Sequence, residues 1–96
     1  MGHDVFGFKD KEHENEIAYL RRGAFNDQAR DIYKVLDATE YDAGCSGCGE
    51  TVFFTRQKLE EALMRLPTGE DHEQERQFVR NLLEKGDEAG AWIGFY

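Results

Sequence analysis

Two helical patterns in the second half of the sequence limit most strongly what this chain can fold into. Each repeats apolar residues at the spacing of one helix face, the first with Leu59, Ala62, Leu63 and Leu66, the second with Phe78, Val79, Leu82 and Leu83. Thr55 is suited to cap the first helix, and Pro67 to end it. A capping box of Thr68 and Asp71 predicts the start of the second helix. Both helices need an apolar layer to pack against.

Two further helices are expected in the first half of the chain. Ile17 and Leu20 lie three residues apart, and Gly23 follows at a position typical of a helix end, which together predict a short helix. Asn26 is suited to cap the next helix, which should end near Ala38. The apolar stripe of that helix consists of Ala29, Ile32, Tyr33 and Leu36.

Short aromatic segments favour strands at both ends of the chain. Residues 4–9 and residues 89–96 are rich in aromatic residues, and we expect them to pair. Residues 40–55 predict a β-hairpin with the glycine-rich segment 42–49 at its tip. The predicted fold is therefore α+β, with a small antiparallel sheet of about four short strands and about four helices packed on one face. The chain of 96 residues suits a single domain, 1–96.

The aromatic residues near the two ends have two interpretations. They are Phe6, Phe8, Trp92, Phe95 and Tyr96. We expect them in the core, because a small protein needs large side chains inside. The alternative is an exposed patch or an edge strand that pairs two copies, so the chain is expected to be a monomer or an edge-strand homodimer.

The charge of the chain narrows the choice of partner. Twenty acidic and 12 basic residues give a net charge of −8, which disfavours nucleic acids and anionic membrane surfaces. A protein partner with a basic surface fits better. The sequence has neither an apolar run long enough to span a membrane nor the pattern of a signal peptide, so we expect a cytoplasmic protein.

An acidic cluster marks one candidate partner-binding surface. It consists of Glu70, Asp71, Glu73 and Glu75, near the expected start of the last helix. Acidic side chains there interact favourably with the positive end of the helix, so a solvated helix start explains them without any partner. As a docking surface, the cluster would bind a basic protein.

The segment Cys45-Ser46-Gly47-Cys48-Gly49 has the form of half a zinc site. Two residues between the cysteines let both sulfur atoms face one ion. His3 is the expected third ligand, with His13 and His72 as alternatives, and a carboxylate or a second copy of the chain would complete the site.

Two other interpretations of the cysteines stay open. A redox dithiol is disfavoured because the segment continues into a strand rather than a helix, and because Glu40, Asp42 and Glu50 lie nearby. The simplest interpretation is a glycine-rich turn whose reduced cysteines act as small residues.

The sequence has no nucleophile elbow, phosphate-binding loop or His-Glu-x-x-His motif, so enzymatic activity is not expected. We therefore expect a non-catalytic interaction or regulatory protein, with a small zinc domain and a dithiol redox protein as alternatives.

Overall fold

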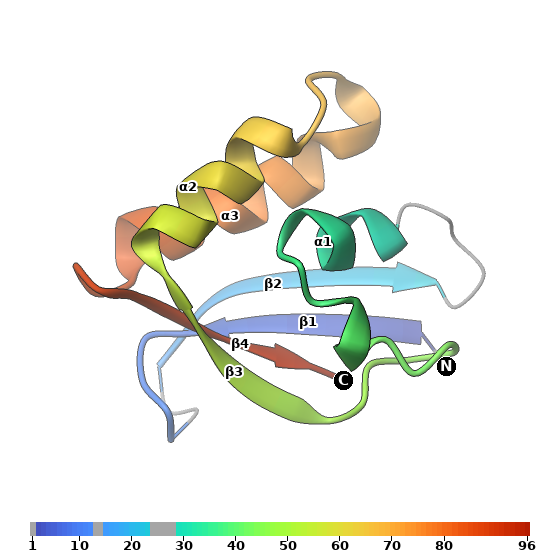
Figure 1. Ribbon diagram of the computed structural model, residues 1–96, viewed down its shortest axis with the longest axis horizontal. Coiled ribbons are helices and arrows are strands. Elements are labelled where there is room, and N and C mark those ends of the chain that lie inside the picture. Colours follow the sequence, from blue (N-terminus) through green and yellow to red (C-terminus); the bar gives the residue numbers. More distant parts are fainter. Residues whose placement is uncertain (1, 13–14, 24–28) are drawn as a thin grey trace.

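In the part of the chain that the structure describes, a four-stranded antiparallel sheet forms one layer and three α-helices form the other (Figure 1). The computed structural model describes residues 2–12, 15–23 and 29–96. The strands are β1 (Gly2–Phe8), β2 (Glu16–Gly23), β3 (Glu50–Thr55) and β4 (Gly90–Phe95). The helices are α1 (Ala29–Val35), α2 (Arg56–Arg65) and α3 (Glu73–Lys85), with short 3₁₀ turns η1 (Thr39–Tyr41) and η2 (Glu70–His72). The predicted α+β class is confirmed.

The sheet has the order β2-β1-β4-β3, so the first and last strands of the chain lie side by side in its centre (Figure 1). Val5 pairs with Phe95, and Phe8 pairs with Trp92. The pairing expected between the two terminal segments is therefore correct. β2 and β3 form the two edges of the sheet.

The helix predicted around Ile17 and Leu20 is wrong, because these residues belong to β2. Ala18 and Leu20 are buried, whereas Tyr19 between them is exposed. This period of two is that of a strand with one side against the core. The register of β1 and β2 shifts at Ile17, which packs against the core as Leu20 does, so their three-residue spacing also fitted a helix face. The described residues form three α-helices where about four were expected, and β2 supplies the fourth strand.

The β-hairpin predicted over residues 40–55 does not form either. Residues 39–41 are the 3₁₀ turn η1, and a single bridge joins Asp42 to Gly47. β3 instead pairs along its whole length with β4, from Glu50 opposite Phe95 to Thr55 opposite Gly90. Residues 40–42, the only part of the expected hairpin before its tip, could not have satisfied as many backbone groups of β3. The cysteine segment is therefore a turn between η1 and β3.

Helix starts follow the predicted pattern only in part. The backbone N–H of Lys58 donates to the Thr55 side chain over 3.2 Å, so the cap expected for α2 is confirmed. α3 begins at Glu73, after η2, and its N-cap residue His72 makes no capping hydrogen bond with its side chain. The cap expected at Asn26 lies outside the described residues.

The core lies between the sheet and the helices. It includes Val5, Leu20, Tyr33, Leu59, Phe78, Ile93 and Phe95. Gly7 of β1 allows α3 to approach the sheet closely, because a Cβ at this position would lie 2.3 Å from Cδ2 of Leu82.

Across the described ranges, every helix is too short or too polar to cross a membrane.

Candidate functional site

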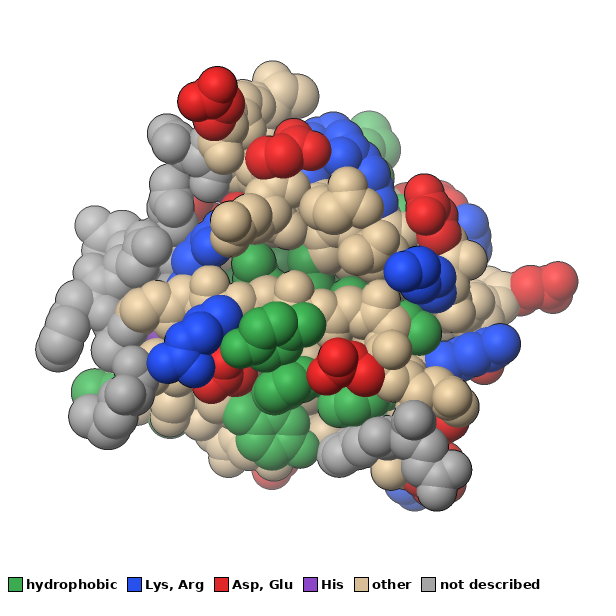
Figure 2. All heavy atoms as spheres, turned by 180° about the vertical axis from the view of Figure 1, so that it is seen from behind, with side chains coloured by type: hydrophobic (Ala, Val, Ile, Leu, Met, Phe, Trp, Pro, Cys, Tyr) green, Lys and Arg blue, Asp and Glu red, His purple; other side chains and the backbone are tan. Residues whose placement is uncertain are grey.

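A group of aromatic side chains covers the side of the sheet that faces away from the helices. It consists of Phe6, Phe8, Tyr19, Phe53, Trp92 and Tyr96, which we call the aromatic face. Side chains alternate between the two sides of a strand, so these residues point away from the core because their neighbours Val5, Phe54 and Phe95 point into it. In the view from behind, hydrophobic side chains gather below the helices, with charged side chains beside them (Figure 2).

The rings of the aromatic face contact one another, and all but the buried Phe8 still expose surface. The Phe6 ring centroid lies 6.0 Å from that of Phe8, 5.0 Å from that of Tyr19 and 5.8 Å from that of Tyr96. Tyr19 and Tyr96 keep 48% and 37% of their surface exposed. Large exposed aromatic side chains in contact with one another are typical of interaction surfaces.

A shallow hollow of about 330 Å³ lies on this face, lined by Phe6, Phe8, Glu16 and Tyr96. Gly94 of β4 provides the space for it. A Cβ at Gly94 would lie 2.6 Å from Cε2 of Tyr96 and 3.3 Å from Cε2 of Phe8. The Tyr96 hydroxyl also lies 3.2 Å from Oγ1 of Thr51 on β3, which holds the tyrosine ring across the sheet.

Asp4, Tyr19 and Arg21 form a polar network on the same side of the sheet. Arg21 Nη1 donates to both carboxylate oxygens of Asp4, at 2.9 and 3.1 Å, and the Tyr19 hydroxyl donates to Asp4 at 2.6 Å. The hydrogen bond to Asp4 raises the pKa of Tyr19 above its ordinary value. The pKa of the Arg21 guanidinium is also raised, by its interaction with Tyr19 and Asp4. The charges of Asp4 and Arg21 therefore largely compensate each other.

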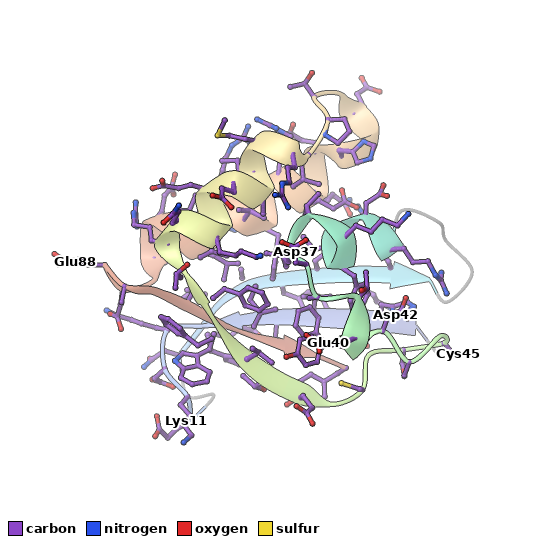
Figure 3. All side chains as sticks on the ribbon, in the orientation of Figure 1. Lys11, Asp37, Glu40, Asp42, Cys45 and Glu88 are labelled. Atoms are coloured by element: carbon purple, nitrogen blue, oxygen red, sulfur yellow. The ribbon has the colours of Figure 1, made fainter. Side chains whose placement is uncertain are left out.

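The cysteine turn is attached to the end of β4 through its glycines. The backbone N–H of Gly47 donates to the carbonyl of Tyr96 over 3.0 Å, and that of Gly49 to the carbonyl of Phe95 over 2.7 Å. Both Cys45 and Cys48 are exposed and unpaired. Figure 3 shows Cys45 at the outer bend of the loop that leads into β3.

His3 is buried and contacts this turn through its imidazole ring. Its Nδ1 lies 2.9 Å from the Tyr33 hydroxyl, and its Nε2 lies 3.0 Å from the carbonyl oxygen of Gly44. A carbonyl only accepts hydrogen bonds, so Nε2 carries the proton and donates. Both ring nitrogens are thus engaged within the protein. Burial raises the pKa of the neighbouring Tyr33 to about 12.

The other residues of the zinc hypothesis are also spread apart. His72 Nε2 lies 3.0 Å from Asp31 Oδ2, and His13 lies outside the described residues. Within residues 2–12, 15–23 and 29–96, no three His, Cys, Asp or Glu side chains gather closely enough to hold a metal ion. Zinc binding through Cys45 and Cys48 and dithiol chemistry both stay predictions.

The acidic cluster near α3 is divided between the surface and the interior. Glu70 and Glu73 are exposed, and Glu73 pairs with Arg80 at 3.1 Å. Glu75 is fully buried, and Arg22 of β2 contacts its carboxylate at 2.6 Å. The side chain of Asp71 lies outside the described part of the chain. Glu75 therefore joins α3 to the sheet instead of sharing a surface with Glu70 and Glu73.

A second hollow, of about 290 Å³, opens between β3 and the start of α2. Asp37 at its margin pairs with Lys58, and with Arg65 at 3.4 Å. The hydrogen bond from Lys58 lowers the pKa of the Asp37 carboxyl. Figure 3 shows Asp37 between α1 and α2, where these pairs connect the two helices. The Asp37 carboxylate is already paired with two cations, so this hollow is the weaker candidate.

From the sequence, we expected the terminal aromatic residues in the core, with an exposed patch as the alternative. Phe95 is buried in the core, but Phe6, Trp92 and Tyr96 lie on the other side of the sheet. The period of two in these segments was the signal, since residues of opposite parity cannot share one side of a strand.

Compared with known proteins, the chain matches no family model, no curated protein and no solved structure.

Proposed function

We propose that this protein is a non-catalytic interaction module that binds a basic segment of a protein partner on its aromatic face. The observation that carries the proposal is the group of contacting rings that none of the described helices covers. Aromatic residues supply much of the binding energy at protein interfaces, because they bury a large area at a small cost in side-chain entropy.

Charge supports a basic partner. The net charge of −8 attracts cationic segments and speeds their association. Glu16 lies at the hollow itself, whereas the other end of the face carries the compensated pair of Asp4 and Arg21. Lysine and arginine side chains also interact favourably with ring faces. A basic segment therefore matches both the rings and the charge.

Nucleic acid is the other class of ligand that exposed aromatic rings on a sheet could bind, since bases stack on such rings. Binding of that kind also needs cationic side chains along the phosphate backbone. On this side of the sheet, Arg21 is already paired with Asp4. The charge balance therefore favours a protein partner.

The proposal is tested by NMR titration of the isotope-labelled protein with a peptide of alternating lysine, arginine and glycine. We expect shifts concentrated at Phe6, Tyr19 and Trp92, weakened by added salt because the attraction is partly electrostatic. Trp92 is the single tryptophan of the chain, so its fluorescence gives a second measure of the same event. An acidic peptide of equal length is the control. Shifts confined to the surroundings of Glu70 and Glu73, or no shifts at all, would contradict the proposal.

A further inference from the structure

We infer that the hollow lined by Phe6, Phe8, Tyr96 and Glu16 receives one arginine side chain of that basic segment. The inference rests on the proposed function and specifies which side chain is recognised, and where. Three features of the hollow support it: the arrangement of its rings, the carboxylate of Glu16, and the contacts that hold Tyr96 in place.

The ring geometry suits a flat cationic group. The Phe6 and Phe8 rings stack with an inclination of only 18°, and Phe8 is buried, so the partly exposed Phe6 ring provides the accessible apolar surface. Tyr96 meets Phe6 nearly edge-on, at 73°, and forms a wall beside that surface. A guanidinium is planar and weakly hydrated, and it stacks readily on aromatic rings.

Glu16 supplies the matching negative charge. It lies at the start of β2, directly opposite Phe8 in the strand register. Among the described side chains, none forms an ion pair or a side-chain hydrogen bond with Glu16, in contrast to Asp4, which binds Arg21 and Tyr19. An incoming guanidinium can donate two parallel hydrogen bonds to such a carboxylate.

These two features together select arginine over other side chains. An apolar side chain would cover the rings but would remove water from Glu16 without replacing its hydrogen bonds. A lysine ammonium is compact and strongly hydrated, and it lacks the planar fork that matches both a ring and a carboxylate. Arginine satisfies both parts of the hollow at once.

The hollow exists before any ligand binds. Gly94 leaves room for the Tyr96 ring, and the contact between Tyr96 and Thr51 holds that ring in place. A preformed site avoids the entropy cost of ordering its side chains upon binding. This favours measurable binding of even a short peptide.

The test compares three peptides that differ at one type of position. The first contains arginines separated by glycine and serine, the second has citrulline in place of each arginine, and the third has lysine. Citrulline keeps the shape of arginine but has no charge. We expect NMR titration to give a dissociation constant about tenfold weaker for citrulline than for arginine, with lysine between them.

Matched variants locate the recognition. Glu16→Gln removes one charge and keeps the shape, and we expect the preference for arginine over citrulline to fall about fivefold. Phe6→Leu keeps apolar volume but removes the central ring, and should weaken arginine binding similarly. Glu84→Gln on α3 and Met64→Leu on α2, both at exposed positions of the helix layer, are the controls, and both should bind as the unmodified protein does. Unchanged shifts of core amides establish that each variant is folded.

The outcomes separate this inference from the proposed function. Equal binding of the arginine and citrulline peptides, or of the arginine and lysine peptides, would overturn the inference while the proposed function stood. Unchanged arginine binding in Glu16→Gln and Phe6→Leu would also overturn it. Failure of every basic peptide, or tighter binding of a single-stranded oligonucleotide to the same residues, would overturn both.

Discussion

The two sides of the sheet use similar residues for opposite purposes. On the helix side, Phe95 is completely buried and its ring lies against those of Tyr33, Tyr41 and Phe54. On the other side, Tyr96 is the next residue along the chain and keeps 37% of its surface exposed. Hydrophobic character alone therefore does not tell core from interaction surface in this protein. What differs between the two sides is the layer of helices.

The comparison gives a physical criterion for the candidate site. A buried ring stabilises the fold because it is removed from water, whereas an exposed ring leaves that free energy available for binding. Substitutions on the helix side should therefore lower stability, and equivalent substitutions on the aromatic face should lower binding. Paired substitutions in neighbouring or similar residues can separate these two effects.

The largest difference is expected between Phe95→Ala and Phe53→Ala. Phe95→Ala leaves a cavity in the core and should lower the free energy of unfolding by about 3–5 kcal/mol. Phe53 is 39% exposed, so Phe53→Ala should cost about 1 kcal/mol or less. Urea denaturation followed by circular dichroism measures both values. Similar losses for the two variants would mean that the aromatic face is covered as well as the core.

Arg21 and Arg22 provide the next comparison, because adjacent residues of β2 point to opposite sides. Arg22→Ala leaves the buried carboxylate of Glu75 without its cation and should cost about 3 kcal/mol or more. Arg21 is exposed and pairs with a partly exposed Asp4, so Arg21→Ala should change stability little. Thermal unfolding of the two variants at equal pH and salt measures the difference. The double variant of Arg22→Ala with Glu75→Gln should recover part of the loss, and no recovery would argue against the pair.

Two glycines make a third comparison of smaller size. Gly7→Ala would push a methyl group into Leu82 on the helix side and should cost about 1–3 kcal/mol. Gly94→Ala would collide with the ring of Tyr96, which can move toward solvent, so the loss of stability should be smaller. Gly94→Ala should nevertheless weaken peptide binding, because the hollow loses its wall. A Gly94→Ala variant that is destabilised as much as Gly7→Ala would show that Tyr96 is fixed by more than its exposed contacts.

The sequence predicted the fold class because its strongest patterns are local. The apolar stripes of α2 and α3 and the cap at Thr55 depend on neighbouring residues alone. The predicted pairing of the terminal segments also proved right, with Val5 opposite Phe95. The element around Ile17 and Leu20 failed, because a short apolar spacing fits a helix and a strand equally until the tertiary partner is known.

The candidate site was less predictable for the same reason. Which side of β1 and β4 is covered depends on where the helices pack, and that information is not local. The position of Glu16 beside Phe8 required β2 to be recognised as a strand. Likewise, the sequence predicted His3 as a metal ligand, whereas the fold places it between Tyr33 and Gly44. Sequence patterns identified the residue types, and the tertiary fold assigned their partners.

The smallest expected effect concerns the ionisation of one tyrosine on each side of the sheet. Burial raises the pKa of Tyr33 to about 12, whereas the hydrogen bond to Asp4 raises that of Tyr19. Because the folded pKa of Tyr33 exceeds its ordinary value of 10.0, its contribution to stability is complete below that pH and is lost as the pH rises through about 12. Asp4→Asn should return the pKa of Tyr19 toward its ordinary value and leave Tyr33 unchanged, as NMR titration of the tyrosine rings would measure. A folded protein in which Tyr33 titrates at its ordinary value would show that the helix side admits water, and the contrast between the two sides would then fail.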